Sequence, residues 1–159
     1  PDSGQVDISA VAVDPERSAI WMTDWVAGSY LYRYDLVTGG YLGKLYLRAP
    51  PPWQQGIAVR DGALFITADD GDAELDEVDN LWRIDLRRDA IVAYAHHEKA
   101  FTELMRAGEI EGIDFDEAAG EMIVLHNRGK QIVSGMPKGL YPGYEREIHE
   151  LYVYRIREP

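Results

Sequence analysis

The chain has 159 residues, of which 46% are hydrophobic and 28% charged, a composition ordinary for a soluble globular protein with a real core. Its formal net charge of −12 argues against nucleic acid or an anionic membrane surface as partners. It contains no cysteine, which excludes disulfides, thiol catalysis and cysteine-ligated zinc and leaves the compartment open, and no apolar run approaches the roughly 18 residues of a membrane span.

The first predicted elements lie in SAVAVDPERSAIWMTD, which begins at residue 9. The segment DPERS separates two short apolar runs, and Asp and Pro favour a tight turn there. Two further runs, YLYRYDL from residue 30 and YLGKLYL from residue 41, are predicted strands, and the first alternates as half-buried strands do. This part of the chain therefore predicts four short antiparallel strands.

The same order of strands recurs further along the chain. The second unit contains QGIAVRDGALFIT from residue 55, NLWRIDL from residue 80 and AIVAYAH from residue 90. The third contains EGIDFDEAAGEMIVL from residue 111 and ELYVYRI from residue 150, and it has no predicted fourth strand. Between these units, the spacing of apolar residues and a glycine at 108 predict one short helix at about 97 to 107.

Four antiparallel strands repeated roughly every 45 to 55 residues are typical of the blades of a β-propeller. We therefore predict an all-β fold in one domain, residues 1–159, with three consecutive four-stranded antiparallel blades at about 8–47, 55–95 and 111–156. A β-sandwich with chance internal similarity is the alternative. Because propellers typically have about four to eight blades, three blades correspond to half of a six-bladed ring.

Two stretches resemble the six-bladed propellers of the SMP-30/gluconolactonase, NHL and SdiA-regulated type. These are EGIDFD, followed by a strand and NRG, and YRYDLVTGG, which closes a blade. In gluconolactonase-like members, an EGP glutamate at a strand start is a metal ligand, helped by Asn and Asp from other blades. The resemblance implies this role for Glu111, with Ile113 where that motif has proline. It also implies a calcium-dependent lactone or ester hydrolase as one candidate function.

The long connections of the predicted blades all lie at one end. The loops between second and third strands span about 25–29, 69–79 and 127–149, whereas the turns at the other end are minimal. Loops on a rigid scaffold often carry function. We therefore expect a ligand, metal ion or partner to bind at the loop-rich end, which we call the mouth.

Three polar residues begin the predicted inner strands. Ser9, Gln55 and Glu111 occupy the same position of the repeat, and we expect all three to face the mouth. Glu111 is suited to bind a cation or a ligand hydroxyl. The alternative is that it caps neighbouring backbone amides or pairs with an arginine.

Acidic residues are concentrated in DDGDAELDEVD, which begins at residue 69. Calcium takes about six to eight oxygen ligands, so clustered carboxylates suit it, although a solvated acidic loop has the same composition. Asp69 is the best candidate ligand, because it follows the predicted second strand nearest the axis.

The segment HNRGK begins at the equivalent strand end, residue 126. We expect His126, Asn127 and Arg128 to point at the mouth. Arg128 would clamp a carboxylate or phosphate, or alternatively pair with Glu111 or the acidic loop.

Aromatic residues also lie in the predicted loops. Trp25 and Trp53 are placed to stack on a sugar or another ring. Trp21 and Trp82 lie inside predicted strands and are expected in the core. The insertion GMPKGLYPGYEREIH, from residue 135, has too many Pro and Gly residues for one element, and we expect an ordered lid or packing arm.

These expectations leave two functions open. One is a propeller module that binds a small ligand or partner at the mouth; the other is the calcium-dependent hydrolase, with Glu111, Asp69 and Asn127 as candidate ligands. Three blades also leave two open sides, so we expect a second copy of the chain, or a missing half of the propeller, to complete the ring. The N-terminal QVDI would then supply the outer strand of the partner's third blade.

Overall fold

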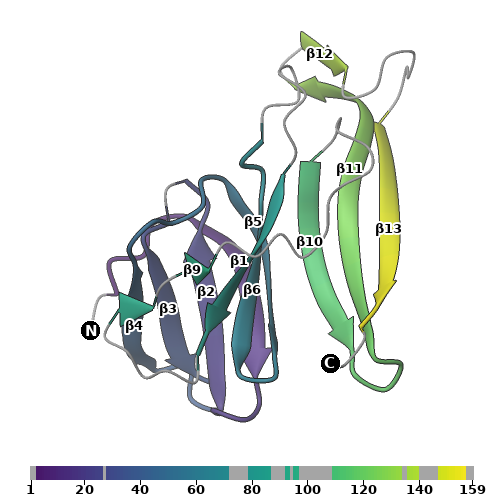
Figure 1. Cartoon of the computed structure of the whole chain (residues 1–159). Helices are drawn as coiled ribbons and strands as arrows, with labels where there is room; N and C mark the ends of the chain where they lie inside the picture. Colours follow the sequence, from purple (N-terminus) through teal and green to yellow (C-terminus); the bar gives the residue numbers. More distant parts are fainter. Residues whose placement is uncertain are drawn as a thin grey trace.

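The computed structural model shows an all-β protein built from three sheets (Figure 1). The described residues are 3–26, 28–71, 79–86, 92–93, 95–96, 109–133, 136–139 and 147–156. Every helix or strand within these ranges is a strand, which confirms the predicted fold class. Within the same ranges, no helix has the length and apolar character that a membrane crossing requires.

The first sheet contains the four strands that the first unit predicts. They pair antiparallel in chain order: β1 (Ile8–Asp14), β2 (Ala19–Asp24), β3 (Tyr30–Asp35) and β4 (Tyr41–Leu47). The turn between β1 and β2 is held by Asp14, which accepts hydrogen bonds from the Arg17 backbone NH, the Arg17 guanidinium and the Trp21 indole. These donors satisfy a carboxylate that is fully buried.

The second sheet is built on β5 (Gln54–Arg60), β6 (Ala63–Ala68) and β7 (Asn80–Asp85). A two-residue turn joins β5 to β6, and both residues have positive φ, 50° at Asp61 and 71° at Gly62. Asp-Gly with two left-handed residues is typical of the type I′ turn, whose twist suits antiparallel strands. The RDG segment therefore forms the tight hairpin that its sequence predicts.

The predicted fourth strand of the second unit, AIVAYAH, is divided between two sheets. β8 (Val92–Ala93) pairs in parallel with β4 of the first sheet, and β9 (Ala95–His96) pairs antiparallel with β7 of the second. The outer edges of β4 and β7 both present unpaired backbone groups, and this segment satisfies part of each. The prediction of one continuous strand is therefore wrong. The helix predicted at about 97–107 lies outside the described residues.

The third sheet contains β10 (Glu109–Asp116), β11 (Glu121–Val133) and β13 (Glu147–Arg155), with β11 in the centre. β12 (Met136–Gly139) pairs with the far end of β11. The prediction of one loop over 127–149 is therefore wrong, because β11 continues to Val133 and pairs with the early part of β13. Backbone pairing with β12 and β13 extends the strand beyond the local apolar pattern.

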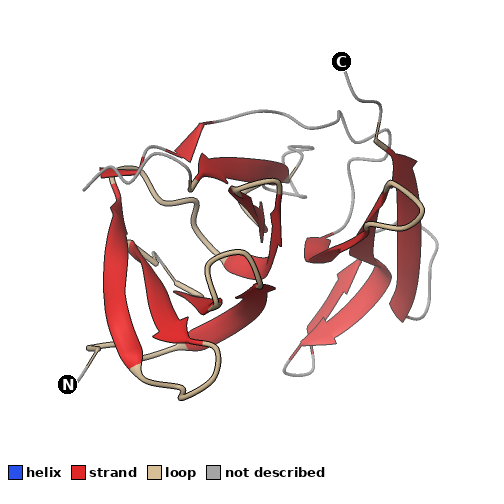
Figure 2. Cartoon of the chain, turned by 90° about the horizontal axis from the view of Figure 1, so that it is seen from below, coloured by secondary structure: helices blue, strands red, loops and turns tan. Residues whose placement is uncertain are grey.

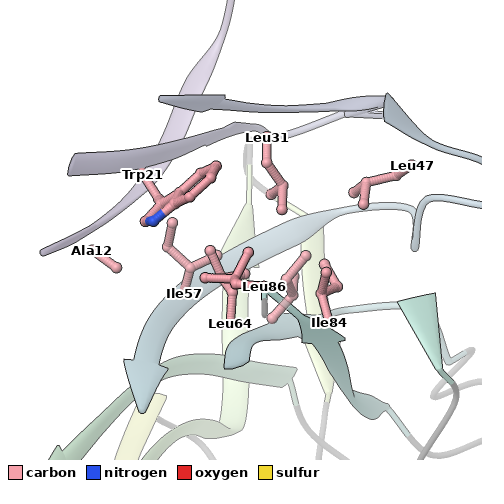
Figure 3. Close-up of a cluster of buried hydrophobic side chains, with 9 residues drawn as sticks. Ala12, Trp21, Leu31, Leu47, Ile57, Leu64, Ile84 and Leu86 are labelled. Atoms are coloured by element: carbon pink, nitrogen blue, oxygen red, sulfur yellow. The ribbon is translucent and has the colours of Figure 1, made fainter. Parts of the chain in front are cut away.

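The three sheets lie side by side, with β5 next to β1 on one side and β10 on the other (Figure 1, Figure 2). One buried cluster joins the first two sheets (Figure 3): Ala12, Trp21, Leu31, Leu47, Ile57, Leu64, Ile66, Ile84 and Leu86. Another joins the second and third: Ala58, Leu81, Ile110, Ile113, Met122 and Val124. Because side chains alternate along a strand, neighbouring residues of β5 enter different clusters, and the second sheet is the middle layer.

The third strand of each sheet is buried where another sheet packs on it and exposed where none does. Leu31, Leu81 and Leu151 hold the same position in β3, β7 and β13, and they are 0%, 4% and 67% exposed. Val153, two residues along β13, is 56% exposed. We call this open face of the third sheet the trailing flank.

The inner strands show the same effect on the other side of the molecule. Val11, Ile57 and Ile113 hold the same position in β1, β5 and β10, and they are 57%, 5% and 9% exposed. Val13, next but one along β1, is 51% exposed. We call this open face of the first sheet the leading flank.

Candidate functional site

The inner strand of each sheet begins with a β-bulge. The register of β1 with β2, of β5 with β6 and of β10 with β11 shifts by one residue, at Ser9, Gln55 and Glu111. The three residues that the repeat aligns therefore hold one structural position, at the mouth end of the strands. In the first sheet, Ser9 Oγ lies 3.2 Å from Thr23 Oγ1. Bulges redirect side chains and are common beside binding sites.

The second and third sheets come into backbone contact at these bulges. Thr67 Oγ1 donates a hydrogen bond to the Glu111 carbonyl at 2.9 Å, from one sheet to the next. A Cβ atom on Gly56 would lie 2.7 Å from Glu111 O and 2.9 Å from Gly112 Cα. Only glycine allows this approach, so Gly56 and Thr67 fix the backbone that carries the half-buried Glu111 side chain.

Trp25 and Trp53 lie together between the first and second sheets. Their ring centroids are 5.3 Å apart in an edge-to-face arrangement, and the residues are 41% and 42% exposed. Gln54 NH donates to Trp25 O, and Asp69 NH donates to Trp53 O. Trp53 has a φ of 50°, which is unfavourable for a bulky residue and often marks a functional position. Both rings therefore stand at the mouth with part of their surface available.

Aromatic residues of the third strands engage carboxylates at the same end. The pairs are Tyr32 with Asp24 at 3.1 Å, Trp82 with Asp70 at 2.8 Å and Tyr152 with Glu150 at 2.7 Å. In each pair the aromatic OH or NH is the donor. Burial and the adjacent Asp24 charge raise the pKa of Tyr32 to about 12, so it remains a donor at neutral pH. These carboxylates serve the packing of their own sheets.

The described acids of the predicted acidic loop are Asp69, Asp70 and Asp79. Asp79 accepts hydrogen bonds from Gly71 NH and Ile110 NH, both at 3.0 Å. The second of these bonds connects the start of β7 to the start of β10, so Asp79 joins two sheets. Residues 72–78 of the loop lie outside the described part of the chain.

Asp79 has a strongly perturbed carboxyl group at the mouth. Burial raises the pKa of Asp79 to about 7; the hydrogen bond from Gly71 opposes this shift, and the Asp69 charge adds to it. A carboxyl group that titrates near neutrality is a typical feature of functional sites, and structural networks can produce it as well. The two backbone hydrogen bonds of Asp79 support the structural role.

His126 lies inside the third sheet. It is 1% exposed, and its ring packs edge-to-face on Tyr152 with centroids 4.8 Å apart. Burial lowers the pKa of His126 to about 4, opposed by the Glu150 charge, so the ring is neutral at physiological pH. The prediction that His126 points at the mouth is wrong, because β11 continues through this position. Asn127 and Arg128 continue the strand, and their side chains lie outside the described part of the structure.

Gln54 is a residue of the mouth that the sequence patterns did not indicate. It is fully buried, and its Nε2 donates to Gly28 O at 2.9 Å and to Pro51 O at 3.3 Å. Its Oε1 has no hydrogen-bond donor among the described residues. The sequence did contain one sign that Gln54 is unusual. Its repeat position is apolar in the other two units, where Ile8 and Ile110 stand.

Calcium, the predicted cofactor, requires about six to eight converging oxygen ligands. Across the described ranges, no group of three or more His, Cys, Asp or Glu side chains could hold a metal ion. Asp69 and Asn127 follow equivalent points of β6 and β11, but the Asn127 side chain lies outside the described part. The donors that the structure describes do not by themselves fit a calcium ion.

Neither a protein-family model nor a curated protein matches the sequence. Among solved structures, the chain is similar to a gluconolactonase from Xanthomonas campestris, described as important in glucose secondary metabolic pathways, at 12% identity and a TM-score of 0.49. That match covers 76% of this chain and 35% of the gluconolactonase, so the chain spans about a third of its length. The chain is also similar to the computationally designed Ika4 protein, at 14% identity and a TM-score of 0.45, over 96% of this chain and 93% of Ika4.

Proposed function

We propose that the chain is a β-propeller module that binds a small ligand at the mouth. The observation that carries the proposal is the threefold bulge, which brings Ser9, Gln55 and Glu111 to one position at the start of the inner strands. Each bulge interrupts a hydrogen-bond ladder, and all three interruptions occur at the loop-bearing end. The turn between β5 and β6, at the opposite end, is by contrast a minimal hairpin.

The polar bulge residues and the Trp25–Trp53 pair suit a polyhydroxylated ring. The CH groups on a sugar face pack on an indole, and hydroxyl, amide and carboxylate side chains bond to sugar hydroxyls. Each tryptophan is a little over two-fifths exposed, which leaves a contact surface for such a ring. A monosaccharide is therefore the first ligand class to test.

Titration of the protein with D-glucose and D-galactose, followed by NMR of the indole NH signals, tests this proposal. We expect the Trp25 and Trp53 signals to shift and the Trp21 signal, from a residue only 2% exposed, to stay in place. Trp53→Ala should weaken binding about three- to tenfold. The matched control is Tyr46→Ala, since Tyr46 is 43% exposed but lies on β4. Unshifted Trp25 and Trp53 signals at high millimolar sugar would contradict the proposal.

A calcium-dependent lactone or ester hydrolase is the second candidate, favoured by the position of Glu111 near the start of β10. If Glu111 binds calcium, Glu111→Gln should lower the melting temperature only when calcium is present, because a ligand stabilises the state that binds it. An equal loss in the presence of a chelator would instead support a capping or ion-pair role for Glu111.

We also propose that a second copy of the chain covers both flanks and completes a ring of six sheets. Neighbouring sheets pack on each other at two places within the chain. The leading flank and the trailing flank are the two faces that would form the same kind of contact but, within the described part of the chain, have no sheet packed on them. The trailing flank of each copy would pack on the leading flank of the other, with twofold symmetry. A missing half of the propeller is the alternative occupant.

The N-terminal segment contacts the first sheet of its own chain. Tyr34 Oη donates to Gln5 Oε1 at 2.9 Å and to Ser3 Oγ at 3.2 Å, so residues 3 and 5 lie against their own first sheet. Exchange of QVDI onto the third sheet of a partner remains a prediction.

A further inference from the structure

A cavity of about 420 Å³ lies between the second and third sheets at the hairpin end, opposite the mouth. Arginines from three strands line it: Arg60 ends β5, Arg83 lies in β7 and Arg155 ends β13. Phe65, Phe115 and Tyr154 provide apolar walls. All of these residues belong to one chain and none lies at the mouth, so the cavity is independent of ring closure and of the mouth ligand.

The charge of this cavity is opposite to that of the molecule. The chain has a net charge of −12, yet three guanidinium groups face one carboxylate, Asp61, in the lining. Arg60 Nε lies 3.1 Å from Asp61 Oδ2 and 3.6 Å from Glu117 Oε2, and these two carboxylate side chains are 81% and 62% exposed. Among the described residues, neither Arg83 nor Arg155 forms an ion pair. Among the described residues, the three guanidinium groups of the cavity therefore outnumber the two carboxylates that pair with them.

Arg60 presents a buried donor without an acceptor. Its side chain is 13% exposed, and its Nη1 has no hydrogen-bond partner within the described ranges. The guanidinium carbon lies 5.5 Å from the centre of the Phe115 ring, and that ring packs edge-to-face on Phe65 at 5.1 Å. A buried N–H without an acceptor is unfavourable, and the aromatic contacts hold this group in position. An anionic oxygen in the cavity would accept a hydrogen bond from Arg60 Nη1 and so remove the cost of leaving this donor unpaired.

We propose that this cavity binds a small organic anion with one carboxylate and an aromatic or other apolar body. A planar guanidinium matches the two oxygens of a carboxylate, and three arginines around one cavity provide that match from more than one side. The aromatic walls accept the apolar body. A volume of about 420 Å³ lies within the range of small-molecule sites.

Isothermal titration calorimetry with 2-naphthoate tests the proposal, with 2-naphthamide as a neutral probe of nearly the same shape and inorganic phosphate as an anion without an apolar body. We expect naphthoate to bind about tenfold or more tightly than naphthamide, because hydrogen bonds to charged groups are strong. Phosphate should bind more weakly than naphthoate. Equal binding of naphthoate and naphthamide, binding of phosphate as tight as that of naphthoate, or no binding of naphthoate would overturn the proposal.

Three variants locate the binding. Arg83→Gln and Arg155→Gln should each weaken naphthoate binding about tenfold. Arg33→Gln is the matched control, because Arg33 holds in β3 the position that Arg83 holds in β7 but does not line the cavity. Affinity unchanged in both cavity variants, or lowered equally in Arg33→Gln, would show binding elsewhere and overturn the proposal. Far-ultraviolet circular dichroism confirms that each variant is folded.

Discussion

At the scale of single residues, one glycine allows two sheets to approach closely. Gly56 lies where β5 meets the backbone of β10, and the neighbouring atoms are a carbonyl oxygen and a Cα. Backbone atoms cannot rotate away as a side chain can. Gly112 holds the equivalent position in the third sheet, where a Cβ would meet only side-chain atoms of Leu125, at 3.5 Å and 3.9 Å.

We expect Gly56→Ala to lower the free energy of unfolding by about 1–3 kcal/mol, the usual effect of overpacking. Gly112→Ala, the matched control, should stay within about 0.5 kcal/mol of the unaltered chain, as substitutions away from special features usually do. Urea unfolding measures both variants. Equal losses in the two variants would contradict the close approach described for Gly56.

Half-buried Asp79 and buried His126 have opposite effects on the pH dependence of stability. The pKa of Asp79 rises from 3.8 to about 7 in the folded protein, so this group favours folding below pH 4 and loses that effect as the pH rises through 7. The pKa of His126 falls from 6.5 to about 4, so burial of the neutral ring favours folding above 6.5 and loses that effect as the pH falls through 4. Between about pH 4 and 6.5 the two contributions oppose each other.

Single substitutions should therefore separate the two contributions. Relative to the unaltered chain, His126→Gln should lose stability as the pH rises from 4 to 6.5, and Asp79→Asn should gain it, each with a slope approaching 1.4 kcal/mol per pH unit, the value for one proton. Urea unfolding across this range gives both differences. Difference curves with no slope in either variant would contradict the assigned protonation states.

At the scale of elements, the β5–β6 hairpin depends on two consecutive residues with positive φ, Asp61 and Gly62. We expect Gly62→Ala to cost about 1–2 kcal/mol of stability, because a Cβ is unfavourable in the left-handed region. Asp61→Gly, at the other left-handed position, should change stability by no more than about 0.5 kcal/mol, since the Asp61 side chain is 81% exposed to solvent. Thermal unfolding of both variants checks the turn, and equal destabilisation would contradict it.

The repeat in the sequence predicts most strands, because strand alternation and turn residues are local signals. It also aligns Ser9, Gln55 and Glu111, since each sheet has its bulge at the same repeat position. The extension of β11 and the division of residues 90–96 depend on which strand edges are free, and the local sequence does not carry that information.

Residues of the candidate sites were likewise predictable where local sequence determines their burial, and not where packing between strands or sheets does. The burial of Trp21, which is 2% exposed, was predictable from its place inside a strand. The burial of His126 results from the continuation of β11, which the apolar pattern does not extend to that point. Arg60, Arg83 and Arg155 share no motif, and only the packing of the second sheet on the third brings them to one cavity.

At the scale of the whole molecule, the two flanks are the strongest indication of a partner. Leu151 is exposed only because no sheet follows the third, and Val11 only because none precedes the first. Contiguous exposed apolar faces usually mark an interface. If two copies close the ring, the contact should bury more than roughly 2,000 Å², as obligate dimers do.

Light scattering of the purified chain at micromolar concentration tests the proposed closure of the ring most directly. We expect a particle of twice the 18.0 kDa chain mass. Leu151→Glu, on the trailing flank, should shift it to the mass of one chain, whereas Val37→Glu, at a residue 84% exposed in the β3–β4 turn, should leave it unchanged. A well-folded monomer of the unaltered chain at this concentration would contradict the account.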